Sequence, residues 1–145
     1  MLFIAYVGFL IYFLLLSDVY GRTGIRTEYA YNLELFKEIT RFWQYRDVLG
    51  TWVVAMNLVG NVAIFMPFGF IIAMAGNHRS FIRATAYTLL FSLCIETVQL
   101  VTKIGSFDVD DLLLNTIGGC IGFIVFSICC MIRRRYVTKK TKKRR

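Results

Sequence analysis

The sequence predicts an all-α membrane protein with four transmembrane helices and an amphipathic interfacial helix in the first outer loop. Three observations support this fold class: the composition, the length of the apolar stretches and the placement of the charges. Of the 145 residues, 57% are hydrophobic and 18% are charged, whereas a soluble domain is nearer half apolar and about a quarter charged. A single Pro and long apolar runs also exclude a disordered or collagen-like chain.

Four apolar stretches supply the predicted helices, at about residues 2–20, 52–75, 81–101 and 111–132. A helix that rises 1.5 Å per residue needs roughly 20 residues to cross a hydrocarbon core of about 30 Å. The last three stretches reach this length, and the first needs Ser17 to Tyr20 to complete its crossing. Because no basic segment precedes the first stretch and no small-x-small cleavage site is evident, we expect a retained helix and not a signal peptide. Together the helices form one membrane domain, residues 1–132.

The long loop between the first two helices has an amphipathic pattern. From Asn32 onward, one helical stripe contains Leu35, Ile39, Phe42 and Leu49, flanked by Phe36 and Trp43. Asn32 is a candidate N-cap, because its side-chain oxygen can accept a backbone N–H of the first turn. We expect this helix to lie in the outer interface with its aromatic residues at headgroup level. It can equally pack as a lid on the bundle, and the two arrangements are compatible.

The basic residues predict a multi-pass protein of the plasma membrane with both termini in the cytoplasm. Nine of the 17 Lys and Arg residues lie in the tail, residues 133–145, and without it the chain is close to neutral. Basic residues near helix ends stay on the cytoplasmic side, and the turn that contains Arg79 also lies there. The loop at 102–111, with one Lys and three Asp, is then outside. We expect the tail to bind anionic lipids of the bilayer and not nucleic acid.

Polar side chains within the predicted helices converge at one depth. Asn57 and Asn61 share a face of the second helix, and Asn57 lies about six residues, or roughly 9 Å, below the outer surface. Glu96 and Gln99, near the end of the third helix, lie at a similar depth, and the start of the fourth helix is shallow as well. Such groups are costly inside a membrane, so each requires a partner or a role.

The start of the fourth helix carries a polar and glycine-rich stripe. If this helix begins at Asp108, one face contains Asp108, Asp111, Asn115, Gly118, Gly119 and Gly122, and Asp110 points away from it. Asp108 has the position of an N-cap, with Asp111 as an acid of the first turn. Gly118 and Gly122 form a GxxxG pair that allows close approach of a neighbouring helix. In the second helix, Pro67 predicts a kink, with Gly69 two residues later.

Three interpretations of the polar residues remain open: hydrogen-bonded contacts between helices, a binding site for a ligand or lipid headgroup, and a catalytic site. Contacts between helices explain the Asn residues well. They explain Glu96 less well, since a Gln would serve without a charge to desolvate. We expect no metal and no cofactor, because the four Cys residues lack CxxC spacing and the single His lies in the cytoplasmic turn.

Three segments also resemble signatures of a known family. Residues 57–70, NLVGNVAIFMPFGF, are similar to the NxxGNxxxFxPxGF signature of the VanZ-like family, named for a teicoplanin-resistance protein. Residues 96–123, ETVQLVTKIGSFDVDDLLLNTIGGCIGF, resemble its second signature of ExxQ, a basic residue (here Lys103, where Arg is frequent), FDxDD, Asn and a Gly-rich helix. Residues 31–39, YNLELFKEI, are similar to the family's NLxPFxxI, with Leu35 in place of Pro.

The resemblance implies a small membrane protein of the bacterial cell envelope, commonly Gram-positive, associated with low-level resistance to teicoplanin and not to vancomycin. We therefore expect a non-enzymatic binding or accessory protein whose partner is a glycopeptide antibiotic or a lipid-linked wall precursor. The alternative is a membrane enzyme that modifies an envelope lipid or such a precursor, with Glu96 or Asp111 as general acid or base. The positions implied by the motifs are Asn57, Gly60, Asn61, Pro67, Gly69, Glu96, Gln99, Asp108, Asp111, Asn115 and Gly119.

Overall fold

Four apolar helices form the body of the protein in a computed structural model, which describes residues 2–16, 27–75 and 80–142. They are α1 (Leu2–Leu16), α4 (Thr51–Ala75), α5 (Phe81–Thr102) and α6 (Val109–Lys142). Within the described residues, α4, α5 and α6 are each long and apolar enough to cross a membrane, and α1 is shorter. The expected extension of the first helix to residue 20 lies outside the described residues. The all-α prediction is confirmed, apart from one short pairing of strands.

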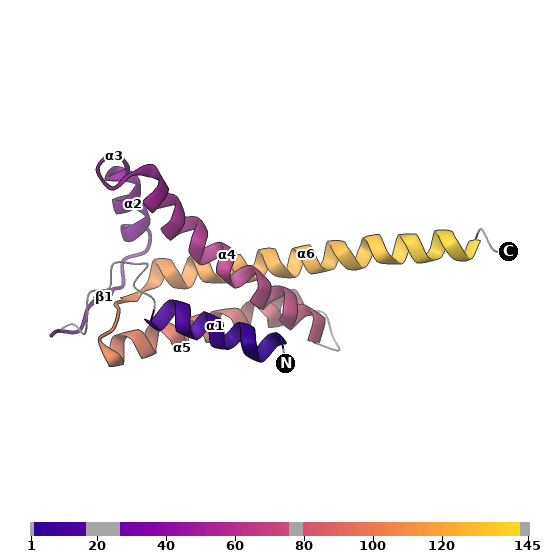
Figure 1. Ribbon diagram of the computed structural model, residues 1–145, viewed down its shortest axis with the longest axis horizontal. Coiled ribbons are helices and arrows are strands. Elements are labelled where there is room, and N and C mark those ends of the chain that lie inside the picture. The colour runs from indigo at the N-terminus through magenta and orange to yellow at the C-terminus, as the bar shows by residue number, and fades with distance from the viewer. Residues whose placement is uncertain (1, 17–26, 76–79, 143–145) are drawn as a thin grey trace.

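The strands and two short helices lie at one end of the bundle, where α4 begins, α5 ends and α6 begins (Figure 1). We call this the polar end. The strands β1 (Tyr31–Asn32) and β2 (Phe107–Asp108) pair in parallel, so that Asn32 lies beside Asp108. The helices α2 (Lys37–Gln44) and α3 (Arg46–Leu49) follow β1 and lead into α4. We call α2 and α3 together the lid.

The lid differs from the single helix expected from the sequence. The chain bends at Tyr45 between the two short helices, and α2 begins only at Lys37. The prediction that Asn32 caps the amphipathic helix is wrong. Its side chain instead closes a turn with the backbone of Glu34, accepting that residue's N–H (3.1 Å) and donating to its carbonyl (3.2 Å). A short Asn side chain favours such local bonds, and the turn delays the start of α2.

Glycines bring α4 and α6 into backbone contact. A Cβ added to Gly118 would overlap the carbonyl of Val62, and one added to Gly122 would overlap that of Met66. Gly69 of α4 lies equally close to the carbonyl of Gly119. The close approach expected of the GxxxG pair is therefore confirmed, and its partner is α4.

Aromatic and aliphatic side chains fill the space between α1, α4 and α5. The buried cluster consists of Leu10, Leu14, Phe65, Phe68 and Ile95. The rings of Phe68 and Phe91 stack with their centroids 4.7 Å apart. Through this cluster α1 packs against α5.

The last helix is longer than predicted. It was expected over residues 111–132, but α6 continues without interruption to Lys142 and extends beyond the other helices toward the C-terminus (Figure 1). No Gly or Pro follows Gly122, and Lys and Arg are good helix formers. Most of the basic tail is therefore a helical continuation of an apolar helix.

Candidate functional site

Asp108 joins three elements at the polar end. Its carboxylate accepts the N–H of Asp110 (2.8 Å), so that it caps α6 as predicted. The same oxygen accepts a bond from the side-chain amide of Asn32 in β1 (3.2 Å). The N–H of Asp108 donates to Oε2 of Glu96 in α5 (2.9 Å). Asp108 and Glu96 are both buried, Glu96 with only 2% of its surface exposed. These bonds fix the start of α6 against β1 and α5.

Asp110 holds the lid in place. It was expected only to point away from the polar stripe of α6, and it is in fact 1% exposed. Its carboxylate accepts the backbone N–H groups of Phe36, Glu38 (2.9 Å) and Ile39 (3.2 Å). These are N–H groups of the first turn of α2, where negative charge is favourable. Phe36, the N-cap residue of α2, has no side-chain oxygen for this task. Asp110 therefore supplies from a distant part of the sequence the cap that Phe36 lacks.

A second layer of polar contacts links the helices. The side-chain amide of Asn61 in α4 donates to Asp111 in α6. One turn after Asp111, Asn115 donates to the hydroxyl of Ser92 in α5 (2.9 Å). Gln99 of α5 donates to the carbonyl of Leu14 in α1 (2.8 Å). The sequence analysis missed Ser92, since a lone Ser in an apolar helix gives no signal of its depth.

The predicted residues therefore separate into three groups. We call the first the buried polar cluster, whose members are all buried except the half-buried Asp111. It contains Asn61, Glu96, Gln99, Asp108, Asp111 and Asn115 together with Asp110 and Ser92. Gly69 and Gly119 belong to the helix contacts, where Thr88 of α5 packs on Gly119. The third group is Asn57, Gly60 and Pro67, which line a different surface.

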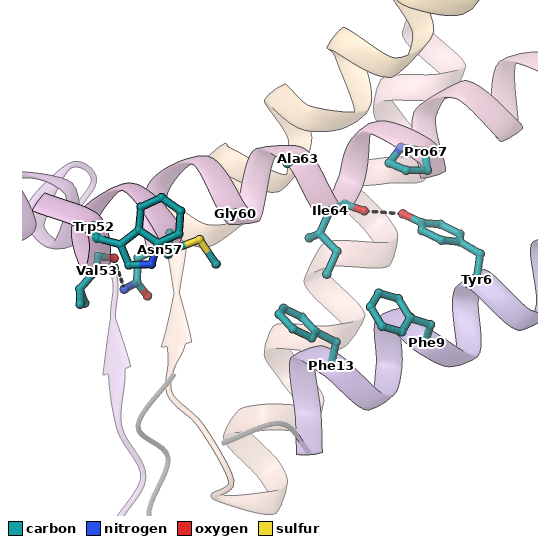
Figure 2. A pocket seen from close by; sticks show the side chains of 11 residues that line it. Tyr6, Phe9, Phe13, Trp52, Val53, Asn57, Gly60, Ala63, Ile64 and Pro67 are labelled. Atoms are coloured by element: carbon teal, nitrogen blue, oxygen red, sulfur yellow. Dashed lines mark hydrogen bonds between the residues drawn. The ribbon is translucent and has the colours of Figure 1, made fainter. Parts of the chain in front are cut away.

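That surface is an apolar groove of about 660 Å³ between α1 and α4. Figure 2 shows the rings of Phe9 and Phe13 projecting from α1 toward α4. At one end the hydroxyl of Tyr6 donates to the carbonyl of Ile64, one turn before Pro67. Pro67 lacks the N–H that would bond to the carbonyl of Ala63 in the preceding turn, and α4 remains helical through it. The lining residues are Tyr6, Phe9, Phe13, Trp52, Val53, Met56, Asn57, Gly60, Ala63, Ile64 and Pro67.

Asn57 belongs to the groove and not to the buried polar cluster. Its side-chain amide donates to the carbonyl of Val53, one turn earlier in the same helix (2.9 Å). The side chain is half-buried, and Figure 2 shows it beside Trp52 at the start of α4. It lies on the same helix as Asn61 but serves a different surface.

Two comparisons with known proteins relate this chain to one family, and the family match covers most of its length. The model of the family described as VanZ/LLP1 matches residues 3–130. The chain belongs to the VanZ/LLP1 family. It is similar to Protein VanZ of Enterococcus faecium, with 32% identity over 72 residues, which are 50% of this chain and 45% of that protein. The matched region thus spans less than half of the relative's length. No solved structure matches the chain.

In this VanZ/LLP1 protein the sequence signatures meet in space. The residues of the FDxDD motif bond to Glu96 of the ExxQ motif, to Asn32 of β1 and to Phe36, the N-cap residue of α2. Lys103, at the position where Arg is frequent, lies at the C-terminal cap of α5 in a left-handed conformation (φ 57°). Its ammonium donates to the carbonyl of Thr27 (3.0 Å) and lies 4.6 Å from the ring centre of Tyr29.

Burial controls the electrostatics of the polar end. It raises the pKa of Asp108 above its ordinary value, and the nearby charge of Asp110 acts in the same direction. The amide of Asp110 and the side chain of Asn32 partly offset this effect by donating to the carboxylate. Burial also raises the pKa of Glu38, which pairs with Arg41 in the lid. Among the described residues, no group of three His, Cys, Asp or Glu side chains is arranged to hold a metal ion.

The two regions of this VanZ/LLP1 protein are suited to different tasks. In the buried polar cluster, carboxylates accept hydrogen bonds from the backbone and from amide side chains, so they connect helices. The groove combines a largely apolar lining with a few polar groups, those of Tyr6, Trp52 and Asn57, a combination that is common in ligand sites.

Proposed function

We propose that this VanZ/LLP1 protein is a non-enzymatic binding or accessory protein of the bacterial cell envelope that lowers sensitivity to teicoplanin or related lipoglycopeptides. The observation that carries the proposal is the groove beside Asn57, which adjoins the polar end in a chain similar to Protein VanZ. The ligand is the drug itself or a lipid-linked wall precursor. The site acts at the outer leaflet, where both molecules are found.

The charge distribution supports this orientation. The basic helical extension of α6, which includes Arg133, Arg134, Arg135, Lys139 and Lys140, stays in the cytoplasm under the positive-inside rule. With four crossings, the N-terminus is cytoplasmic as well. The polar end, with its lid, then faces outward, and the exposed Trp43 and Trp52 are at the headgroup level that Trp prefers.

Burial supports a binding role over catalysis. A general acid or base must come within hydrogen-bonding reach of its substrate. Glu96 is 2% exposed and accepts the N–H of Asp108. Asp111 accepts a bond from Asn61. Asp111 is half-buried, so burial argues against Glu96 as the acid or base, and the alternative enzyme would first have to open the polar end to reach Glu96.

The test is drug susceptibility in a sensitive Gram-positive host that expresses the wild type, Asn57→Ala or Val59→Ala at matched membrane levels. Asn57→Ala removes the side-chain amide that lines the groove and one bond within α4. Val59 is an exposed residue of the same helix outside the groove and serves as the control. We expect the wild type and Val59→Ala to protect against teicoplanin and not vancomycin, and Asn57→Ala to lose this protection.

Two results would contradict the proposal. If the wild type gives no protection against teicoplanin, the proposed resistance function is wrong. If Asn57→Ala and Val59→Ala protect equally, the groove has no part in resistance. If the groove is required for protection, the two ligands are distinguished by binding. The purified protein is tested on immobilised teicoplanin and, in parallel, on a purified lipid-linked precursor.

A further inference from the structure

We propose that the groove between α1 and α4 holds one acyl chain of a membrane phospholipid, with its headgroup near Trp52 and Asn57. This is a statement about lipid binding alone, and it does not require that the protein confer resistance. It begins from how α1 sits in the bundle. α1 packs on α5 and on one part of α4 through the cluster of Leu10, Leu14, Phe65, Phe68 and Ile95, whereas elsewhere it faces α4 across a groove of about 660 Å³.

The surroundings of the groove are apolar. Its lining residues on α4 run from Trp52 to Pro67, within a helix long and apolar enough to cross a membrane. Protein interiors are close-packed and leave few voids larger than a water molecule. A water in such a space needs two to four polar partners, and this lining offers few. In a bilayer, hydrocarbon chains are the molecules available to fill it.

The polarity of the groove matches an amphiphile. Asn57 uses its side-chain N–H to bond the carbonyl of Val53, which leaves its side-chain oxygen available as an acceptor. Trp52, 75% exposed, lies at the same end and carries an indole N–H. Beyond them the lining is Gly60, Ala63 and Ile64 on one side and the rings of α1 on the other (Figure 2). One end suits a headgroup, and the rest suits a chain.

The inner end of the groove indicates the length of its occupant. From Trp52, at headgroup level, to Ile64 the helix rises about 18 Å, and half of a hydrocarbon core is about 15 Å. The hydroxyl of Tyr6 spans to the carbonyl of Ile64 near this inner end. A chain that begins at headgroup level therefore reaches this contact at the depth where one leaflet ends. An acyl chain fits this space, whereas a long polyprenyl chain would continue past it. Of the two ligands in the proposed function, the length of the groove therefore favours the drug over the lipid-linked precursor.

The experiment uses the full-length protein in phosphatidylglycerol nanodiscs that contain a trace of phosphatidylglycerol with a diazirine in one acyl chain. After irradiation, mass spectrometry of the peptides locates the attached lipid. We expect labelling of the groove residues about tenfold above that of the exposed positions Ile82 and Leu90 on α5. Equal labelling of the groove and α5 would overturn the proposal.

Matched variants test the position of the chain. Ala63→Phe places a ring at an exposed position that lines the groove, and Val59→Phe adds the same ring at an exposed position of α4 outside it. Labelling of the groove should fall about tenfold in Ala63→Phe and stay unchanged in Val59→Phe. Met56→Trp, at a partly exposed lining position, provides a second blocking variant if Ala63→Phe does not fold. Wild-type labelling in a folded blocking variant would contradict the assignment.

A competition arm distinguishes the class of lipid. A trace of polyprenyl phosphate should leave the labelling unchanged. Complete loss of groove labelling in the presence of polyprenyl phosphate would show that the groove selects an isoprenoid, and the acyl-chain assignment would be wrong. The readout is attachment of lipid and does not depend on resistance. If the groove is labelled but the protein gives no teicoplanin protection, the lipid site is supported and the proposed function is wrong.

Discussion

The N–H of Asp108 donates to a carboxylate oxygen of Glu96 over 2.9 Å, and this bond fixes the first turn of α6 against α5. Both residues are buried. A buried N–H without an acceptor is costly, since its desolvation is not compensated. At this contact the carboxylate of Glu96 therefore stabilises the fold as a hydrogen-bond acceptor.

This relationship predicts different outcomes for two substitutions of Glu96. Glu96→Gln keeps an acceptor oxygen and should retain most of the stability. Glu96→Leu leaves the N–H of Asp108 without its acceptor and should lower the free energy of unfolding by about 1–3 kcal/mol. Titration of the purified variants with SDS in mixed micelles measures the difference. Equal loss in both variants would mean that charge, and not the hydrogen bond, stabilises this contact.

Asp110 should control the order of the lid. Asp110→Ala removes the acceptor for three N–H groups at the start of α2, so local stability should fall by about 1–3 kcal/mol. Hydrogen exchange of residues 36–44 should speed up, while exchange in α4 and α5 changes little. Asp47→Ala, an exposed acid of α3, is the control. Unchanged exchange over residues 36–44 in Asp110→Ala would show that other contacts hold the lid.

The glycine contacts predict a sharp dependence on side-chain size. Gly122→Val would force the backbones of α4 and α6 apart, because even a Cβ there overlaps the carbonyl of Met66. We expect a loss of about 1–3 kcal/mol or more in the SDS titration. Gly8→Ala is the matched control, since a Cβ at Gly8 of α1 meets open space, and it should be neutral or slightly stabilising. Similar effects at the two positions would contradict the assigned packing.

Much of the fold could be predicted because its signals are local. Hydrophobic length locates α4, α5 and the start of α6, the GxxxG spacing indicates close helix packing, and Asp108 precedes its helix in the position of an N-cap. The end of α6 was placed too early, because the charges at Arg133 mark where the apolar stretch ends. They do not stop the helix.

The division of the polar residues could not be predicted from the sequence. Asn57 and Asn61 are four residues apart, which separates their directions by only about 40° around the helix. Which neighbour each one meets depends on the positions of α1 and α6, and these are set by packing over the whole bundle. In the same way, Asp110 bonds to residues more than seventy positions away, at the start of α2. Periodicity carries no information about such long-range partners.

The raised pKa of Asp108 predicts a pH dependence with a definite sign. Between its ordinary value of 3.8 and the higher value in the folded protein, the folded state binds more protons than the unfolded state. The contribution of Asp108 to stability must therefore increase as the pH falls through this window and decrease as it rises. The charged groups that act on it are Glu38 and Arg41 of the lid and Asp110 of α6, and the carboxylate of Glu96 in α5 accepts its backbone N–H.

The measurement compares the wild type with Asp108→Asn, which keeps a side-chain oxygen for the N–H of Asp110. The difference in their free energies of unfolding, followed by SDS titration from neutral pH down toward pH 4, isolates the titration of this one carboxyl. We expect the free energy of unfolding of the wild type to rise relative to that of the variant as the pH falls, because protonation removes a charge that is costly to bury. Asp47→Asn should show no such trend, since Asp47 is exposed. A difference that is constant with pH, or that changes in the opposite direction, would mean that the hydrogen bonds from Asn32 and Asp110 outweigh burial in setting the pKa of Asp108.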